Sequence, residues 1–334
     1  MTTEYDLSPE DFADTAKAVV NACAEADTTA ARIALLADAG LTGILASDSS
    51  GGMGLPVDFA VPVLHAAGAG MLAAPLLETM LLAQAFSGTR DDLATAIAIG
   101  HTKVTIAWNG ELDGSAGTVD RAPLAEDCDA VLVFRRDGSA ILVTLGESAE
   151  VLAEDTLDLE RPEARVVITA AEGPVLSAET VTELQRTAQI LRSALILGAA
   201  EDSLERACEY AQDRRQFGKT LVSYQAIQHH LARQCLAVET IRNSIARSLS
   251  PHCEMPVDAA RATFIGATGL GANTAETAIQ IFGGMGYTWD VPLHRHLRFV
   301  RTLAAQGKAA ELLDNVAQQL LSAENNKKEL QRAS

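Results

Sequence analysis

The sequence contains few aromatic residues, few basic residues and no long apolar run. Phe, Trp and Tyr make up only 4% of its 334 residues, which favours closely packed helices over a large aromatic-rich sheet. There are 44 acidic and 26 basic residues, and the formal net charge of −18 excludes a general nucleic-acid or anionic-membrane surface. The apolar run at residues 59–77 is interrupted by His65 and several glycines, so we expect no membrane span.

Cysteine is also scarce and scattered along the chain. No Cys-x-x-Cys pair or metal-ligand spacing occurs, so we expect reduced thiols in the core and no metal site. The polar and acidic opening Met1-Thr2-Thr3-Glu4 predicts no signal peptide and a cytoplasmic protein. The five cysteines are Cys23, Cys128, Cys208, Cys235 and Cys253.

The pattern of apolar residues divides the chain into three parts. A chain of this length can bury a sizeable core, and we expect a mainly α protein with a small β domain. The predicted parts are an N-terminal helical domain at residues 1–90, an abbreviated β domain at 91–175 and a C-terminal four-helix bundle at 176–334.

Residues 6–87 predict four helices with recognisable starts. Ile33, Leu35 and Leu36 form the apolar face of the second helix, which Gly40 ends. His65 lies on the apolar stripe of the third helix, so it is predicted to be a hydrogen-bonded core histidine rather than a ligand. The predicted starts are Ser8 as N-cap with Pro9 at the first helical position, Thr28 or Thr29, Asp58, and Pro75.

Short β-branched runs replace the helical pattern in the middle of the chain, and long helices follow. Asp137-Gly138 predicts a hairpin turn between two strands. The helix at 256–282 is apolar nearly all round, so we expect it at the centre of a bundle or in an oligomer interface. The predicted strands are residues 103–108, 130–134, 140–144 and 165–169. The predicted C-terminal helices run from a cap at Ser177 to about residue 215, from 224 to 248 and from 256 to 282.

The first candidate binding stretch is Asp213-Arg214-Arg215-Gln216-Phe217-Gly218-Lys219, with Gln225 six residues on. It stands at the C-terminal end of a predicted helix, where the helix dipole favours a cation. Phe217 supplies an anchoring ring and Gly218 a flexible bend, so Arg214 and backbone N–H groups can face one anionic group such as a diphosphate. Alone, such a stretch is more often an ordinary helix C-cap.

The second candidate stretch is Gln280-Ile281-Phe282-Gly283-Gly284-Met285-Gly286-Tyr287. Its three glycines, Gly283, Gly284 and Gly286, let main chain come close to a ligand. The Gln280 amide can both donate to and accept from a base or ribose. Alone, a glycine cluster after a helix is usually a turn.

Taken together, the two stretches resemble the C-terminal half of the acyl-CoA dehydrogenase family. The elements are Arg-x-x-Phe-Gly-Lys, a Gln at this spacing, two long helices and Gln-x-Phe-Gly-Gly-x-Gly-Tyr. Residues 36–44 and Ser-Gly-Gly-Met-Gly-Leu at 50–55 are similar to the family's opening helical domain, and the resemblance covers residues 15–90 and 180–320. It implies FAD as cofactor, with its diphosphate and adenosine held by Arg214, Gln216, Phe217, Gln225, Gln280, Gly283, Gly284 and Gly286.

Other parts of the family pattern are missing. The flavin-holding Thr-Glu-Pro with Gly-Ser-Asp is absent, and so is the Lys-x-Trp-Ile-Thr strand beside the flavin ring. In this family a glutamate removes the α-proton of the acyl-CoA while the β-hydrogen leaves as hydride to the flavin. The two positions known for that glutamate match Gln306-Gly307-Lys308 and Ala188-Gln189, so no catalytic residue is predicted.

The retained and missing parts imply a division of roles between two chains. In the family's dimer one FAD crosses the interface, with its ring in one subunit and its adenine end in the other. The resemblance therefore implies the non-catalytic subunit of a bacterial α2β2 acyl-CoA dehydrogenase that acts on a steroid or bile-acid side chain. The expected partners are a catalytic subunit, which binds most of the acyl-CoA, and an electron acceptor.

Two alternatives remain open at the level of sequence. The first is a self-sufficient homo-oligomeric dehydrogenase with a displaced base such as Glu311, about one helical turn past the vacant position. Glu183 is the acid nearest the other vacant position, and both acids read most simply as solvated helix surface. The second alternative is a scaffolding protein that has lost its flavin.

Overall fold

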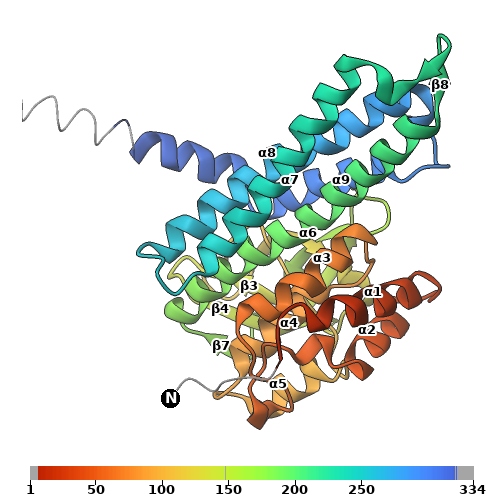
Figure 1. Ribbon diagram of the computed structural model, residues 1–334. Coiled ribbons are helices and arrows are strands. Elements are labelled where there is room, and N and C mark those ends of the chain that lie inside the picture. Colours follow the sequence, from red (N-terminus) through yellow and green to blue (C-terminus); the bar gives the residue numbers. More distant parts are fainter. Residues whose placement is uncertain (1–6, 147, 320, 322–334) are drawn as a thin grey trace, which may run out of the picture.

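The computed structural model describes residues 7–146, 148–319 and 321, and the fold is mainly helical, with two small sheets beside a long-helix bundle and a two-stranded hairpin at one end of that bundle (Figure 1). This confirms the predicted fold class. The N-terminal helices are α1 (Asp11–Ala24), α2 (Thr29–Asp38), α3 (Val61–Ala69), α4 (Leu76–Phe86) and α5 (Asp91–Ala98). The later helices are α6 (Ala178–Asp213), α7 (Gln225–Leu249), α8 (Pro256–Phe282) and α9 (Leu293–Gln306), and residues 309–319 are also helical.

The helix starts follow the predicted caps except in the first and third helices. Thr28 caps α2 by accepting a hydrogen bond from the Ala31 N–H (3.1 Å), and Gly40 ends it with φ 73°. The third helix, α3, begins at Val61 rather than at Asp58, and the residues before it form a 3-10 helix, Val57–Ala60. Helix α1 begins only at Asp11. There the Asp11 carboxylate accepts from the Ser8 N–H, while residues 9–10 form a turn.

The apolar face predicted for α2 is wrong at one residue, Leu35, which is not buried. Ile33 and Leu36 are buried, whereas Leu35 is exposed, because it lies on another side of a helix with 3.6 residues per turn. His65 is half-buried and its Nε2 lies 2.5 Å from a carboxylate oxygen of Glu201, so it is hydrogen-bonded as predicted.

The strands between residues 104 and 176 form two sheets that differ in direction. The first has the order β1-β3-β4-β7, in which only β1 and β3 are parallel, and the second is antiparallel with the order β2-β6-β5. Two predicted strands match β3 and β4 exactly, and Gly138 (φ 84°) lies in the turn between them. The strands are β1 (Val104–Ile106), β2 (Gly117–Pro123), β3 (Ala130–Phe134), β4 (Ala140–Thr144), β5 (Ala149–Ala153), β6 (Glu163–Ile168) and β7 (Val175–Leu176).

The sequence analysis missed β2, β5, β7 and helix α5. Strand β2 reads Gly-Thr-Val-Asp-Arg-Ala-Pro and β5 reads Ala-Glu-Val-Leu-Ala, compositions that local propensity does not assign to strands. Helix α5 packs against α4 at the start of the segment predicted as a β domain. The domain limits at residues 90 and 175 remain predictions.

Helix α8 lies at the centre of the C-terminal bundle, against α6, α7 and α9. One stripe of α8 is nevertheless exposed on this single chain, and it consists of small and polar side chains. This stripe comprises Ala262, Gly266, Gly269, Asn273, Glu276 and Gln280.

The cysteines form no disulfide, but only Cys23 is fully buried. The expectation of core thiols is wrong for Cys235, which lies on the outer face of α7. No helix in the described ranges is long and apolar enough to cross a membrane, and these ranges hold no cluster of His, Cys, Asp and Glu arranged for a metal ion.

Candidate functional site

The first predicted stretch forms a small hairpin at one end of the bundle, where Figure 1 labels β8. Helix α6 ends at Asp213, and the chain turns back on itself between β8 (Arg215–Gln216) and β9 (Lys219–Thr220). The Tyr224 hydroxyl donates to the Gln216 carbonyl (3.0 Å), and the Lys219 ammonium lies 4.1 Å from the centre of the Tyr224 ring. The hairpin therefore has a defined shape before any ligand binds.

Phe217 occupies the tip of this hairpin in a conformation that is unfavourable in isolation. Its φ is 51°, in the left-handed region, and its side chain is 93% exposed. Gly218 follows with φ 86°. A large ring held outward at the cost of backbone strain is typical of a side chain that contacts another molecule.

The second stretch forms a tight turn directly after α8. Gly283 has φ 65° and ψ −139°, and neither it nor Gly284 has an atom near the position of a β-carbon, so both leave open space above the backbone. Gly286 differs, because it is buried and a β-carbon there would lie 2.8 Å from the Ile279 carbonyl. The close packing of the turn on α8 therefore explains why a glycine is needed at position 286, without any ligand.

An aromatic stack holds the two stretches together. The rings of Tyr210 on α6 and Phe282 on α8 lie 4.1 Å apart with an interplanar angle of 15°. These residues are close to the C-terminal ends of their helices, so the hairpin and the glycine turn leave the bundle side by side. The structure thus brings together the two stretches that are far apart in the sequence.

The polar side chains of these stretches are available for a ligand. Arg214, Gln216, Gln225 and Gln280 are all exposed. Within the described residues, the Arg214 guanidinium and the three glutamine amides make no hydrogen bond or ion pair. One guanidinium and several amides therefore converge on this end of the bundle without internal partners.

Large apolar side chains are exposed in the same region. Met285 and Tyr287 lie within the glycine turn and Trp289 follows it, and all three side chains are exposed. Trp289 packs edge-on against His294 at the start of α9 (4.8 Å between ring centres). Exposed apolar side chains of this size, like that of Phe217, are of the kind that a partner chain covers.

The positions matched to the family's usual glutamate are closed. Gln306 is buried, and its amide donates to a carboxylate oxygen of Glu163 (3.0 Å). A β-carbon on Gly307 would overlap the ring of the fully buried Phe264. No side chain of any size fits at Gly307 without movement of that ring.

The other acids considered from the sequence lie on helix surfaces. Ala188 is fully buried in the core, and Glu183 is exposed and pairs with Arg186 one turn along α6 (2.5 Å). Glu311 is exposed on the helix at residues 309–319. Neither glutamate lies in the dry pocket that a general base beside the acyl group requires.

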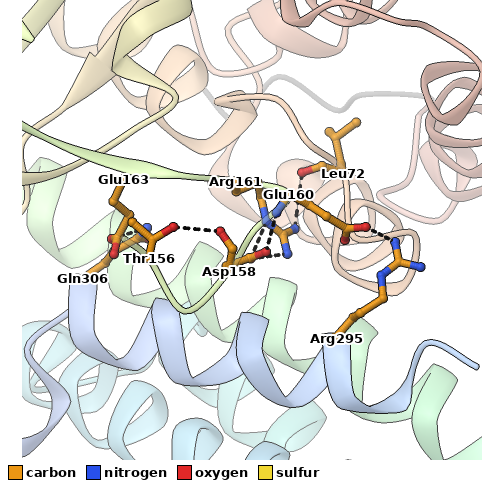
Figure 2. A network of polar contacts seen from close by, with 8 residues as sticks. All are labelled: Leu72, Thr156, Asp158, Glu160, Arg161, Glu163, Arg295 and Gln306. Carbon is orange, nitrogen blue, oxygen red and sulfur yellow. Dashed lines mark hydrogen bonds and ion pairs between the residues drawn. The ribbon is translucent and has the colours of Figure 1, made fainter. Parts of the chain in front are cut away.

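A buried polar network, which the sequence analysis missed, lies over α9 (Figure 2). The Arg161 guanidinium donates twice to a carboxylate oxygen of Asp158 (2.6 and 2.8 Å) and lies 3.6 Å from the centre of the Phe299 ring. Glu160 pairs with Arg295, and Glu163 accepts from Arg121 (2.9 Å) as well as from Gln306. Burial lowers the pKa of Arg161 and raises that of Glu163.

A second buried cluster joins α4, β1 and α6. The Trp108 indole N–H donates to a Glu78 carboxylate oxygen (2.9 Å), and the Arg192 guanidinium stacks 3.7 Å above the Trp108 ring. Burial raises the pKa of Glu78 and lowers that of Arg192 to about 10. The indole is thus bound to the chain's own side chains.

A cavity of about 40 Å³ remains between the N-terminal helices and α9, room for little more than one or two waters. Its walls are mainly apolar, with Leu64, Leu77 and Phe299 among them, and Arg161 and Gln306 close one side. An acyl group of several fused rings does not fit in this space.

Comparison with known proteins identifies the family. The family model for the acyl-CoA dehydrogenase C-terminal domain matches residues 180–321. Acyl-CoA dehydrogenase FadE27 of Mycobacterium tuberculosis is 29% identical over 85% of this chain and 86% of its own length. The chain belongs to the acyl-CoA dehydrogenase family. Acyl-CoA dehydrogenase FadE34 of the same organism is 30% identical over 79% of this chain, which spans only 38% of that longer protein.

Solved structures of acyl-CoA dehydrogenases share the fold over almost the whole chain. A Tcur3481-Tcur3483 steroid acyl-CoA dehydrogenase variant aligns with a TM-score of 0.83 and 21% identity, covering 95% of this chain and 98% of the other. The ChsE4-ChsE5 complex from Mycobacterium tuberculosis aligns with a TM-score of 0.82 and 25% identity, covering 96% and 98%. FAD is the cofactor of the acyl-CoA dehydrogenase family.

Proposed function

We propose that this chain is the non-catalytic subunit of a heteromeric, FAD-dependent acyl-CoA dehydrogenase. In this assembly, of the form α2β2, the chain completes the FAD site of a catalytic partner in the cytoplasm. The observation that carries the proposal is the contrast between an open set of binding groups at the bundle end and a closed cleft over α9.

The residues at the bundle end fit one part of FAD. The diphosphate is an anion that a guanidinium can bind with two parallel hydrogen bonds, and Arg214 is exposed for this role. The open backbone of Gly283 and Gly284 allows close approach, and the amides of Gln225 and Gln280 can meet a ribose or an adenine edge. Gln216 and the Phe217 ring project from the hairpin beside them.

The cleft over α9 does not fit the rest of the cofactor and its substrate. Gln306 and Gly307 stand where the family's usual glutamate is expected, and both are packed against neighbours. When bound, FAD accepts the hydride from the β-carbon of the acyl group. We therefore assign proton removal, the flavin ring and most of the acyl-CoA to the partner.

The substrate class is proposed from the heteromeric relatives. One structural neighbour is described as a steroid acyl-CoA dehydrogenase with two named chains, and another as the ChsE4-ChsE5 complex. We extend this to a bulky acyl-CoA, such as a steroid or bile-acid side-chain thioester, with oxidation at the α and β carbons. A partner-side pocket for fused rings is consistent with a closed cleft in this chain.

The two alternative functions have less structural support. A self-sufficient enzyme needs a base in the cleft, and Glu311 is exposed on a helix surface instead. A flavin-free scaffold gives no reason for an exposed Arg214 beside two open glycines.

The test is FAD content and turnover in the complex co-expressed from the neighbouring genes. Arg214→Ala removes a charge-assisted contact worth about 1.5–3 kcal/mol, so we expect roughly ten- to a hundred-fold weaker FAD retention with the heteromer still assembled. Arg247→Ala, at the other end of α7, is the matched control and should retain normal FAD.

The isolated chain provides the second arm of this test. We expect it to bind FAD poorly and to dehydrogenate nothing. Stable flavin uptake and turnover by the pure chain would instead support the self-sufficient enzyme. A fully flavin-free complex would support the scaffold, and normal FAD content in Arg214→Ala would show that other residues hold the diphosphate.

A further inference from the structure

The connection between β5 and β6, residues 154–162, crosses the cleft over α9 and is called the strap below (Figure 2). We propose that the strap permanently occupies this chain's own acyl-CoA cleft. In place of a ligand, the strap connects the N-terminal helices, α9 and the second sheet. The proposal builds on the proposed function, in which catalysis takes place in the partner.

The centre of the strap is tied to two parts of the chain that flank the cleft. The Arg161 guanidinium donates to the Leu72 carbonyl (3.3 Å), in the loop between α3 and α4, while its face covers the Phe299 ring on α9. Asp158, within the strap itself, neutralises this guanidinium, and both side chains are buried. One strap residue thus joins the N-terminal helices to the bundle.

The two sides of the strap are fastened separately. On one side, Glu160 pairs with Arg295 in the first turn of α9. On the other, Glu163 at the start of β6 accepts from Gln306 (3.0 Å) in the last turn of α9 and from Arg121 (2.9 Å) on β2. The strap and the strand after it therefore contact the full length of α9 and also the second sheet.

In the second half of the strap, residues 157–161, the side chains are oriented in the reverse of the way found in an ordinary surface loop. Of the strap's charged residues, Asp158 and Arg161 point inward and are 4% and 7% exposed, whereas Glu154 and Asp155 at its start are exposed. Its apolar residues Leu157 and Leu159 point outward and are 55% and 63% exposed. General solvation predicts the opposite, so the inward position of the charges reflects specific pairing inside the cleft.

The apolar space behind the strap is too small for a fused-ring ligand, and the open hollow of about 360 Å³ between the start of the strap, β2 and α9 is lined mainly by polar side chains. The cavity of about 40 Å³ is bounded by Arg161 and Gln306, and both side chains are hydrogen-bonded in place. A fused-ring acyl group can enter only if the ties to Asp158, Phe299 and Glu163 are broken together. This chain's own cleft is therefore unable to bind acyl-CoA for two reasons: the strap fills it, and the catalytic side chains are missing.

Hydrogen exchange of the full-length chain tests this proposal. We expect amides of residues 156–161 to exchange at least about tenfold more slowly than those of the exposed hairpin at residues 215–220, and cholyl-CoA to leave their rate unchanged. Strap amides that exchange as fast as the hairpin, or a rate altered by cholyl-CoA, would overturn the proposal. This arm uses the unmodified protein and needs neither FAD nor the partner.

A double variant sharpens the result. Asp158→Ala with Arg161→Ala removes both charges, so that neither is left buried alone, and we expect at least about tenfold faster exchange in the strap with increased anilinonaphthalene sulfonate fluorescence. Unchanged protection in a variant that folds by circular dichroism would contradict the fastening role. A complex that lacks FAD while the strap stays protected would refute the proposed function and leave this inference intact.

Discussion

The hairpin end of the bundle and the cleft over α9 are built in opposite ways. At the hairpin end, Arg214 and Gln280 have no partner among the described residues and the Phe217 ring is exposed. In the cleft, Arg161 and Glu163 are buried and bound to neighbours. Under the proposed function, the unpaired exposed groups mark a surface for another molecule, whereas the buried, internally paired groups Arg161 and Glu163 mark a surface that no longer receives one.

The largest effect that tests this contrast is expected at Arg161. Arg161→Ala leaves the Asp158 carboxylate buried without its counter-charge and removes the contact with Phe299, so we expect a loss of about 3–5 kcal/mol in the free energy of unfolding. Urea denaturation measures it. The matched control is Arg136→Ala, which breaks an exposed pair with Asp113 and should cost under about 1 kcal/mol. Equal losses of unfolding free energy in the two variants would show that burial does not strengthen the contribution of the Arg161–Asp158 pair.

The next effect is a dependence of stability on pH, which comes from the buried side chain of His296 on α9. His296 is fully buried against Ser203 (Nδ1 to Oγ, 3.0 Å), and burial lowers its pKa from 6.5 to about 4. The unfolded chain takes up this proton at higher pH than the folded chain. This contribution to stability is therefore complete above pH about 6.5 and is lost as the pH falls toward 4, up to about 3 kcal/mol.

Urea titrations of the wild type and of His296→Gln between pH 7.5 and 4 measure this contribution. The wild type should lose more stability than the variant over the interval, and the values at pH 7.5 provide the reference for each protein. Parallel curves would show that His296 is not buried in its neutral form.

A smaller effect on stability is expected at Gly307, where close packing against the Phe264 ring leaves no room for a side chain. Gly307→Ala forces a methyl group against the Phe264 ring, and such overpacking costs about 1–3 kcal/mol. Gly266→Ala in α8 is the control, because a β-carbon there meets open space and should stabilise the isolated chain by about 0.5–1 kcal/mol. A neutral or stabilising Gly307→Ala would mean that the position is open.

The smallest effect is expected at the hairpin end. Gln280→Ala removes only a neutral hydrogen bond to the ligand, about 0.5–1.5 kcal/mol, so FAD retention by the complex should fall about two- to tenfold with no change in the stability of the isolated chain. Gln185→Ala, exposed near the start of α6, should change neither quantity. A drop in stability without a drop in FAD content would assign Gln280 to the fold.

Local signals explain how much of the fold could be predicted from the sequence. Helix α8 was predicted residue for residue, because Pro256 fits a first helical position and Gly283 supplies the backbone that ends it. The start of α1 was wrong, because the Asp11 carboxylate takes over the local hydrogen bonding. Strand β5 was missed because its alanines and glutamate favour helix, and pairing with β6 decides its state.

The candidate site also contains parts that could be predicted from the sequence and parts that could not. The hairpin and glycine stretches could be located because each is contiguous in the sequence. The strap could not, because its partners are distant: Arg161 contacts Leu72 and Phe299, and Glu163 contacts Gln306. The three glycines were also indistinguishable by sequence, although Gly286 is required by its own packing against Ile279.

The stack of Tyr210 on Phe282 has a consequence for how this molecule can change over time. Because one pair of rings supports both the hairpin and the glycine turn, we expect a substitution in either ring to disturb both elements at once. We therefore expect the hairpin and the glycine turn to be retained together or lost together during evolution. A substitution that alters only one of them would have to lie outside this pair of rings, at the tip of the hairpin or of the glycine turn.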